Sequence, residues 1–201
     1  MFGRLSAIRD LLAESEPLYY PDVFPAPAGL LEMLVNQFPW ETVTEARDEL
    51  FMSPGGGVSY TYGQGRGARE YLSIDEFSLI KNMRYFLNGV LLGLGYKNHI
   101  NGCFLNRYSD DHKHLGWHAD DFVGMDHEVP VVVISFGEPR EIWWRVFGQG
   151  GVVPPECRQI LEPGSMLIMP PGFQHTHQHR IPKGGRSMGP RVSMTFRGFL
   201  S

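Results

Sequence analysis

Cysteine is scarce in this chain, and long apolar runs are missing. Only Cys103 and Cys157 occur among the 201 residues, and they have neither CxxC spacing nor the number that a disulfide framework needs. The longest apolar stretch, Val129–Phe136, is far shorter than a membrane span. Charged residues interrupt the N-terminal segment LSAIRDLLAESE, so it does not resemble a signal peptide. We expect a cytoplasmic protein that does not associate with membranes.

An excess of positive charge is also missing. The chain has 18 Lys and Arg residues against 22 Asp and Glu residues, a formal net charge of −4. This balance does not favour a protein that binds nucleic acid over its whole surface, although it is compatible with a local basic groove. The length and the 42% of hydrophobic residues fit one compact domain. We expect a monomer without an obligate protein partner.

The distribution of apolar residues divides the chain into two parts, residues 1–98 and residues 99–201. The first part has apolar positions at helical spacing, and its Gly-rich stretch 53–69 predicts turns around a short strand. The second part has short β-rich runs, such as VPVVVISFG and RVSMTFRGFL, that alternate with Gly/Pro turns. We expect an α+β, mainly β fold, in which a helical and loop-rich N-terminal layer covers a C-terminal β-sandwich or barrel.

Two helices are predicted in the first part. The segment Ala28–Phe38 places its large apolar residues on one helical face, and Pro39 ends it. A second helix is expected to begin at a cap provided by Ser73 or Asp75 and to run to about Leu92, where glycines follow.

The segment HLGWHADD offers a possible metal site. In an extended strand, residues i and i+2 point to the same face, so His118 and Asp120 can occupy two neighbouring corners of a coordination sphere. A further histidine would complete the facial triad of a non-haem Fe(II) oxygenase, which keeps positions open for a chelating co-substrate and O2. The segment HTHQHRIP offers His175, His177 and His179, and their spacing does not choose among them. Such a tract could instead bind zinc, and three other histidines are expected to lie exposed in loops: His112, His114 and His127.

The run RVSMTFR near the C-terminus carries two arginines on one face of a strand. Alternation separates two sets of side chains: Arg191, Ser193, Thr195 and Arg197 on one face, and Val192, Met194 and Phe196 on the core face. The two guanidinium groups begin ~20 Å apart, and inside a β-sandwich they require anions, which a metal-chelated dicarboxylate supplies. The run NRYS places Asn106 and Tyr108 on one face, where an amide and a phenol suit a carboxylate. The alternative is an edge strand with solvated arginines.

Four motifs, taken in order, resemble the AlkB family of Fe(II)- and 2-oxoglutarate-dependent dioxygenases. They are NRYSDDHKHLGWHADD, SFGEPREIWWR, PGSMLIMPPGFQHTHQHRIP and GPRVSMTFR, and they lie within residues 99–200. The resemblance implies a double-stranded β-helix, or jelly roll, with the N-terminal part as a nucleotide-recognition lid. It also implies that His179, in HRIP, is the third Fe(II) ligand beside His118 and Asp120.

The same resemblance implies the co-substrate contacts and the reaction. Asn106, Tyr108 and Arg191 would bind the distal carboxylate of 2-oxoglutarate, and Arg197, with Thr195 close by, would hold the carboxylate end next to the iron. The implied reaction uses O2 and 2-oxoglutarate to dealkylate a base such as 1-methyladenine or 3-methylcytosine in DNA or RNA, and it releases formaldehyde, succinate and CO2. The target base is expected to leave the stack, or to lie in a single strand, because the iron is buried.

Several residues are candidates for contacts with the nucleic acid. Tyr60 and Tyr62, in YTYG, resemble part of the family's lid and could stack on the base, although aromatics that merely pack the lid would look the same. Arg140, followed by Glu141, matches a charged pair of the family after SFG and suggests a role in the pocket. Four basic residues in Gly-rich turns could contact phosphates or be ordinary solvated charges: Arg66, Arg69, Lys183 and Arg186.

One position departs from the family pattern. Many members that repair DNA carry an acidic residue two positions after the aspartate of HxD, whereas this chain has Phe122 there, after Asp121. We expect both residues to border the substrate, and the change puts the reading of adenine and cytosine in question. One alternative is a 2-oxoglutarate dioxygenase that acts on a protein or a small molecule, which the acidic net charge also favours. The other is a non-catalytic cupin-like binding protein, against which the intact ligand motifs argue.

Overall fold

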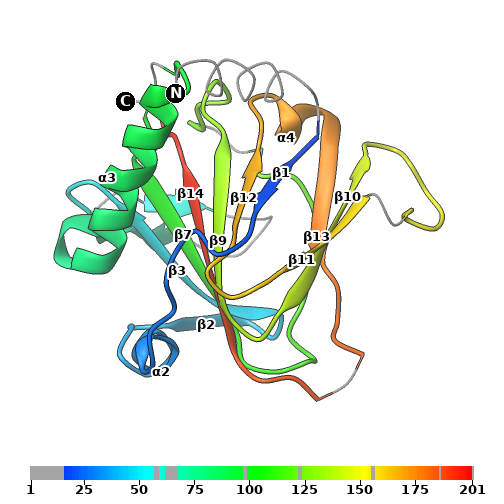
Figure 1. The fold of residues 1–201 in the computed structure, drawn as a ribbon, viewed down its shortest axis with the longest axis horizontal. Helices are drawn as coiled ribbons and strands as arrows, with labels where there is room; N and C mark the ends of the chain where they lie inside the picture. The colour runs from blue at the N-terminus through cyan, green and yellow to red at the C-terminus, as the bar shows by residue number, and fades with distance from the viewer. Residues whose placement is uncertain are drawn as a thin grey trace.

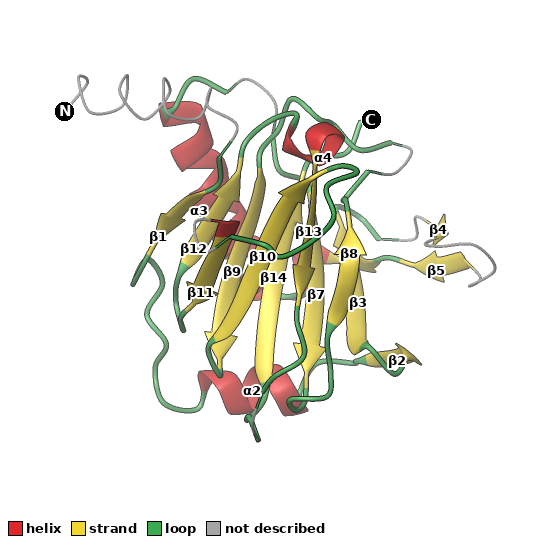
Figure 2. Ribbon diagram, turned by 90° about the vertical axis from the view of Figure 1, so that its right-hand side faces the viewer, coloured by secondary structure: helices red, strands yellow, loops and turns green. Residues whose placement is uncertain are grey.

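Two β-sheets packed face to face form the centre of the molecule, and the longest helix lies outside the larger sheet (Figures 1 and 2). The computed structural model describes residues 16–56, 59–61, 68–96, 99–121, 124–154, 157–185 and 187–200, and at 43, 59–61 and 68–70 it describes the backbone alone. The longest helix in these ranges has 16 residues, and none of their helices combines the length and the hydropathy that a membrane span requires.

The larger sheet has the arginine strand at its centre. The strands follow one another in the order β1 (Leu18–Tyr20), β12 (Met166–Met169), β9 (Val131–Gly137), β14 (Arg191–Arg197), β7 (Gly102–Tyr108), β3 (Arg47–Ser53) and β2 (Glu41–Thr44), with β6 (Leu72–Ser73) beside β3. Strand β14 pairs with β7 on one side and with β9 on the other, over most of its length. It is therefore an interior strand, and its arginines are not the solvated arginines of an edge strand.

The smaller sheet brings the two histidine-rich segments together. Its strands lie in the order β11 (Arg158–Leu161), β10 (Arg140–Val146), β13 (His177–Ile181) and β8 (Leu115–His118). Figure 2 shows this sheet in front of the larger one, with a separate hairpin of β4 (Ser59–Thr61) and β5 (Ala68–Glu70) to one side. The two facing sheets form the double-stranded β-helix, or jelly roll, that the sequence predicts.

Strand alternation separates the helix-covered core from a cavity between the sheets. The core side chains of β14, Val192, Met194 and Phe196, are fully buried in the cluster that also contains residues of the helices. The four side chains on the opposite face all line the cavity: Arg191, Ser193, Thr195 and Arg197. The two predicted faces of this strand are thus confirmed, and the charged face is the one turned toward the smaller sheet.

The predicted helices exist, with shifted ends. The first is α2 (Leu30–Asn36), shorter than the predicted Ala28–Phe38. The Ser73 hydroxyl accepts a hydrogen bond from the backbone N–H of Asp75 at 3.3 Å, but it caps a 3-10 turn, η1 (Ile74–Glu76). The long helix α3 (Ser78–Gly93) begins after this turn and packs Ile80, Leu87 and Leu91 against the larger sheet (Figure 1).

The first half of the chain is more than a helical and loop-rich layer. Strands β1, β2, β3 and β6 belong to the larger sheet, and β3 pairs with β7 along five residues. The prediction missed β3 because its sequence, RDELFMS, begins with three charged residues, although all seven residues are buried. Their charges are paired within the fold, as with Arg47 and Glu49, whose Nη2 and Oε1 atoms lie 2.9 Å apart.

Candidate metal centre and co-substrate cavity

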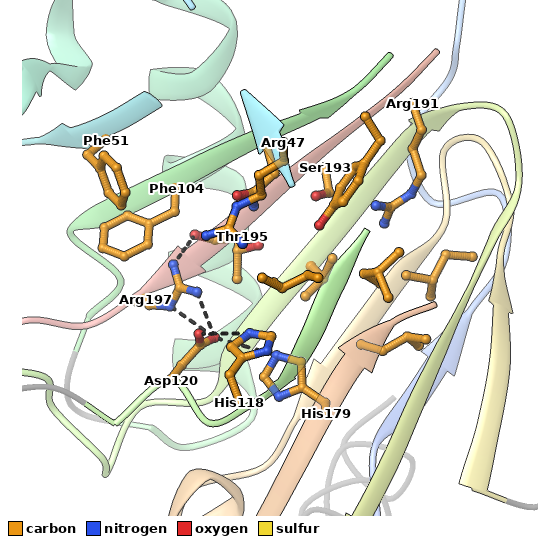
Figure 3. A pocket seen from close by; sticks show the side chains of 17 residues that line it. Arg47, Phe51, Phe104, His118, Asp120, His179, Arg191, Ser193, Thr195 and Arg197 are labelled. Carbon is orange, nitrogen blue, oxygen red and sulfur yellow. Dashed lines mark hydrogen bonds and ion pairs between the residues drawn. The ribbon is translucent and has the colours of Figure 1, made fainter. Parts of the chain in front are cut away.

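His118, Asp120 and His179 converge at one end of the cavity between the sheets (Figure 3). His118 ends β8 and stands opposite His179 of β13 in the strand register, and Asp120 follows two residues after His118. The Nε2 atoms of His118 and His179 lie 3.7 and 3.9 Å from the Asp120 carboxylate oxygens. All three ligand atoms lie within 4.8 Å of one another. Two imidazoles and one carboxylate in this arrangement fit the facial triad of a non-haem Fe(II) site.

The structure chooses among the three histidines of HTHQHRIP. Only His179 faces His118 across the β8–β13 ladder. His177 is buried further along the strand, where its ring stacks on Phe173 at a centroid distance of 4.5 Å. His175 is exposed, and its ring lies beside that of His127 at 4.0 Å. Strand register, which spacing in the sequence does not reveal, therefore places His179, and neither of its two neighbours, in the candidate ligand group.

A hydrogen bond sets the ring of His118 to present a lone pair to a metal ion. The Nδ1 atom of His118 lies 2.9 Å from the carbonyl oxygen of Gly116. A carbonyl oxygen only accepts, so Nδ1 carries the proton and Nε2 is free to bind. Burial lowers the pKa of His118, against the opposing charge of Asp120. Burial and the nearby His118 lower the pKa of His179 to about 3, so both rings are neutral at pH 7, as metal binding requires.

Asp120 is held by its backbone and by its side chain. Its N–H donates to Gln174 Oε1 at 2.9 Å, and Gln174 lies on α4 (Phe173–Thr176). Its Oδ2 atom accepts from Arg197 Nη2 at 2.6 Å and from Arg197 Nε at 3.2 Å. Burial acts to raise the pKa of Asp120, but the charge and hydrogen bonds of Arg197, together with the two histidines, outweigh it and hold this pKa well below the ordinary value. The carboxylate is therefore ionised and oriented before any metal arrives.

Arg191 marks the other end of the same cavity (Figure 3). Its side chain is 1% exposed, and its Nε donates to Ser135 Oγ at 2.9 Å. The two terminal nitrogens are also buried, and neither donates a hydrogen bond to a described residue. The ring of Tyr108 lies 5.3 Å from the guanidinium. Burial lowers the pKa of Arg191 to about 10, so the group is still charged at neutral pH.

The charges around the cavity fit a metal ion and a dicarboxylate. Among the described residues, the cavity is lined by three guanidinium groups, those of Arg47, Arg191 and Arg197, and by one carboxylate, that of Asp120. Arg47 is paired with Glu49 and Arg197 with Asp120, whereas no described carboxylate lies within ion-pair distance of Arg191. A buried guanidinium with two idle donors requires an anion, and a planar carboxylate matches its paired donors. The residues present therefore fit a carboxylate ligand that extends from Arg191 toward the metal centre.

Several other predicted site residues also line this cavity. Asn106 and Tyr108 of β7 and Thr195 of β14 do so, as the sequence predicts. Arg197 is in the cavity as well, but in this structure its guanidinium is bound to Asp120 and stands 4.1 Å from the centre of the Phe104 ring. Its predicted contact with 2-oxoglutarate stays a prediction.

Arg140 does not line the cavity. Its guanidinium donates to the backbone carbonyls of Asp110, Lys113 and Pro182 at 3.2, 2.9 and 2.6 Å. It therefore ties two loops to β10, and its predicted contact with substrate stays a prediction. Arg140 shares a strand face with Ile142, which lines the cavity, but at the start of β10 its guanidinium is bound by these loop carbonyls.

The other residues predicted to contact the nucleic acid are exposed, described by their backbone alone, or outside the described residues. Asp121 is exposed, next to the buried Asp120. Tyr60 lies on β4, opposite Arg69 of β5, with its backbone alone described. Lys183 is exposed. Four positions lie outside the described residues: Tyr62, Arg66, Phe122 and Arg186.

Sequence reasoning missed Arg47, Glu49 and Gln174. Arg47 and Phe51, two strand repeats apart on β3, line the cavity. The alternation of Arg47, Glu49 and Phe51 was the available signal, because charged residues that share a strand face with an aromatic one often mark a buried polar site. No comparable signal identified Gln174, since its role depends on where α4 meets the loop of Asp120.

The fold and this site define an Fe(II)- and 2-oxoglutarate-dependent dioxygenase. A sequence model described as the 2OG-Fe(II) oxygenase superfamily matches residues 74–197. DNA oxidative demethylase ALKBH2 of Mus musculus is 33% identical over 105 residues, which are 50% of this chain and 44% of that protein. The human alpha-ketoglutarate-dependent dioxygenase alkB homolog 3 is 26% identical over 188 residues, 84% of this chain and 60% of that protein. The chain thus spans about half the length of these relatives.

Solved structures agree on the fold. A 2OG-Fe(II) oxygenase family oxidoreductase from Burkholderia pseudomallei superimposes with a TM-score of 0.63 at 15% identity, over 97% of this chain and 89% of that one. OsALKBH1 gives a TM-score of 0.56 at 19% identity, over 92% and 98%. The chain belongs to the 2OG-Fe(II) oxygenase superfamily and, within it, to the AlkB family. This membership implies Fe(II) and 2-oxoglutarate.

Proposed function

We infer that this chain removes N-alkyl groups oxidatively from bases in DNA or RNA, with Fe(II), 2-oxoglutarate and O2. One observation carries the proposal. A single cavity joins the ligand set His118, Asp120 and His179 to the idle guanidinium of Arg191 at its other end. When bound, iron with 2-oxoglutarate supplies the oxidation of an unactivated carbon. The chain's own residues must then hold the co-substrate, keep the ligands ordered and limit the access of water.

The cavity walls suit the carbon chain of a dicarboxylate. Between the two charged ends, Ser193 and Thr195 share the wall with apolar side chains from both sheets: Leu115, Val133, Ile142, Leu161 and Ile181. These groups exclude water from the methylene carbons and strengthen the electrostatic contacts at either end. Asn106 and Tyr108 add an amide and a phenol near Arg191. We assign the distal carboxylate of 2-oxoglutarate to this end.

The substrate class comes from the relatives. Two of them are named for oxidative demethylation of DNA or as alkB homologues. His118 and His179 have side chains only 15% and 7% exposed, so a base inside a duplex does not reach them unless it leaves the stack. The products of the proposed reaction are the repaired base, formaldehyde, succinate and CO2.

A panel of alkylated oligonucleotides tests the proposal. Purified protein with Fe(II), ascorbate and 2-oxoglutarate should remove methyl groups from 1-methyladenine or 3-methylcytosine in single- or double-stranded DNA or RNA, as mass spectrometry detects. His179→Ala should be inactive. Intact consumption of 2-oxoglutarate with no demethylation of any oligonucleotide would refute the substrate class and leave a dioxygenase of proteins or small molecules.

A further inference from the structure

A second group of possible metal ligands lies outside the cavity. The side chains of Asp121, His127 and His175 bring one ligand atom each within 4.8 Å of one another. His127 Nε2 and Asp121 Oδ1 lie 3.4 Å apart, and the ring centroids of the two histidines lie 4.0 Å apart. None of the three lines the catalytic cavity. His127 was expected to be an exposed loop residue, but its side chain is only 23% exposed, beside Asp121.

The spacing suits a tetrahedral metal ion. Bonds of about 2.0–2.1 Å from zinc to nitrogen or oxygen place neighbouring ligand atoms about 3.3 Å apart. The separation of 3.4 Å between His127 and Asp121 already matches this value. His175 is exposed, so its ring can rotate toward the other two with little loss of packing. Two imidazoles and one carboxylate suit zinc and its neighbours among divalent transition metals.

One short element holds all three segments in place. The N–H of Gly172, just before α4, donates to the carbonyl of His127 at 3.2 Å, and the carbonyl of Gly172 accepts from the N–H of His175 at 3.0 Å. The N–H of Asp120, one residue before Asp121, donates to Gln174 of the same helix at 2.9 Å. These bonds fix the backbones of the ligands before a metal arrives, which reduces the ordering that binding requires.

The two centres are neighbours in sequence but distinct in environment. The side chain of Asp120 is 5% exposed and that of Asp121 is 54% exposed. The first carboxylate is therefore buried in the cavity, and the second is in contact with solvent. Arg197 holds Asp120 at the buried centre. Asp121 is exposed and paired with His127 instead.

We propose that Asp121, His127 and His175 form a second, surface-exposed site for a divalent transition metal ion, which takes Zn2+. The bound ion ties the segment after Asp120 to α4. It also makes Asp121 a metal ligand, so that this carboxylate is withdrawn from the substrate contact predicted for it. The metal site itself does not depend on the proposed substrate.

The first test counts metal ions. After treatment with a chelator, the wild-type chain should bind two Zn2+ ions, one at each centre, in competition with a chromophoric chelator. His175→Ala should bind one. His112→Ala, which removes an exposed histidine outside the cluster, should bind two. Two ions bound by His175→Ala with unchanged affinity would overturn the proposal.

The second test removes the contribution of the catalytic centre. In His179→Ala, added Zn2+ should shift the imidazole NMR signals of His127 and His175 but not that of His112. Unshifted signals would overturn the proposal. If this variant does not fold, Asp121→Asn in the otherwise wild-type chain replaces it. Loss of an outer partner of a metal ligand costs about 10–100-fold in affinity, so this change at a ligand should weaken the second Zn2+ by about tenfold or more, and an unchanged affinity refutes the site.

Discussion

Replacing Arg191 by methionine should separate co-substrate binding from folding stability, because the two respond in opposite directions. Burial lowers the pKa of this guanidinium from 12.5 to about 10, which corresponds to about 3 kcal/mol against the charged form in the folded protein. The change also removes the bond to Ser135, worth about 1.5 kcal/mol. The free energy of unfolding of the protein without co-substrate should therefore stay equal or rise by about 1–2 kcal/mol.

Binding of 2-oxoglutarate should weaken sharply in the same variant. Loss of one partner from a buried charge pair costs about 2–5 kcal/mol, which is about 30- to 4000-fold in Kd. Calorimetry with Mn2+ in place of iron measures the Kd, and urea unfolding measures the stability. Arg191→Lys is the matched control, because it keeps the charge but loses the paired donors, and it should bind with intermediate affinity.

A linked measurement strengthens this test. At about 100 times its Kd, 2-oxoglutarate should stabilise the wild-type protein by about 2.7 kcal/mol. The same concentration should not stabilise Arg191→Met measurably. A variant that unfolds more easily than the wild type, yet binds 2-oxoglutarate equally well, would show that the idle guanidinium is structural and that the co-substrate binds elsewhere.

Three further predictions concern the metal ligands and the loops. Gln174→Ala frees the N–H of Asp120 and should lower metal affinity about tenfold or more, as measured by metal titration, whereas Gln174→Glu, which keeps an acceptor oxygen, should lose less. The pKa of His179 is about 3 in the folded protein and about 6.5 in the unfolded chain. Between these pH values the unfolded chain therefore binds more protons than the folded protein. The free energy of unfolding of the metal-free protein, measured with urea, should therefore fall as the pH drops from about 6.5 toward 3. Arg140→Ala leaves three carbonyls without their charged donor and should lower the free energy of unfolding by about 2–4 kcal/mol, as urea unfolding also measures.

Each of these predictions has a clear contrary result. Unchanged metal affinity in Gln174→Ala would mean that the helix does not position Asp120. For the pH series, His179→Asn should flatten the profile, and an equally steep profile in that variant would assign the effect to other groups. Wild-type stability in Arg140→Ala would mean that water replaces the guanidinium at the three carbonyls.

Local pattern was enough to predict the polar face of β14 and the pair His118 and Asp120. Both depend only on the period of two in an extended chain, which holds whatever the strand packs against. The prediction of a β-rich jelly roll in the second half rests on the same regularity. The hydrophobic face of β14 is buried under the helices, as alternation requires.

Where pattern alone failed, the missing information was long-range pairing. The strand β3 was hidden because its charged residues look like surface residues until the fold pairs Asp48 with Arg107 of β7, whose Nε lies 2.9 Å from the Asp48 carboxylate. The bonds of Arg140 to three loop carbonyls were likewise not predicted. Neither outcome is visible locally, because a charge is tolerated in the interior only when a distant partner is present.

The metal centre illustrates the same division of information. The sequence alone supplies its chemistry, since two imidazoles and a carboxylate are present in HxD and HTHQHRIP in any conformation. The choice of His179 over its two neighbours belongs to the folded chain, because it follows from the register between β13 and β8. That register is set by packing between the sheets, and it depends on residues far from the ligands. The same fold leaves His175 outside, beside Asp121 and His127, where composition by itself distinguishes no second group of ligands.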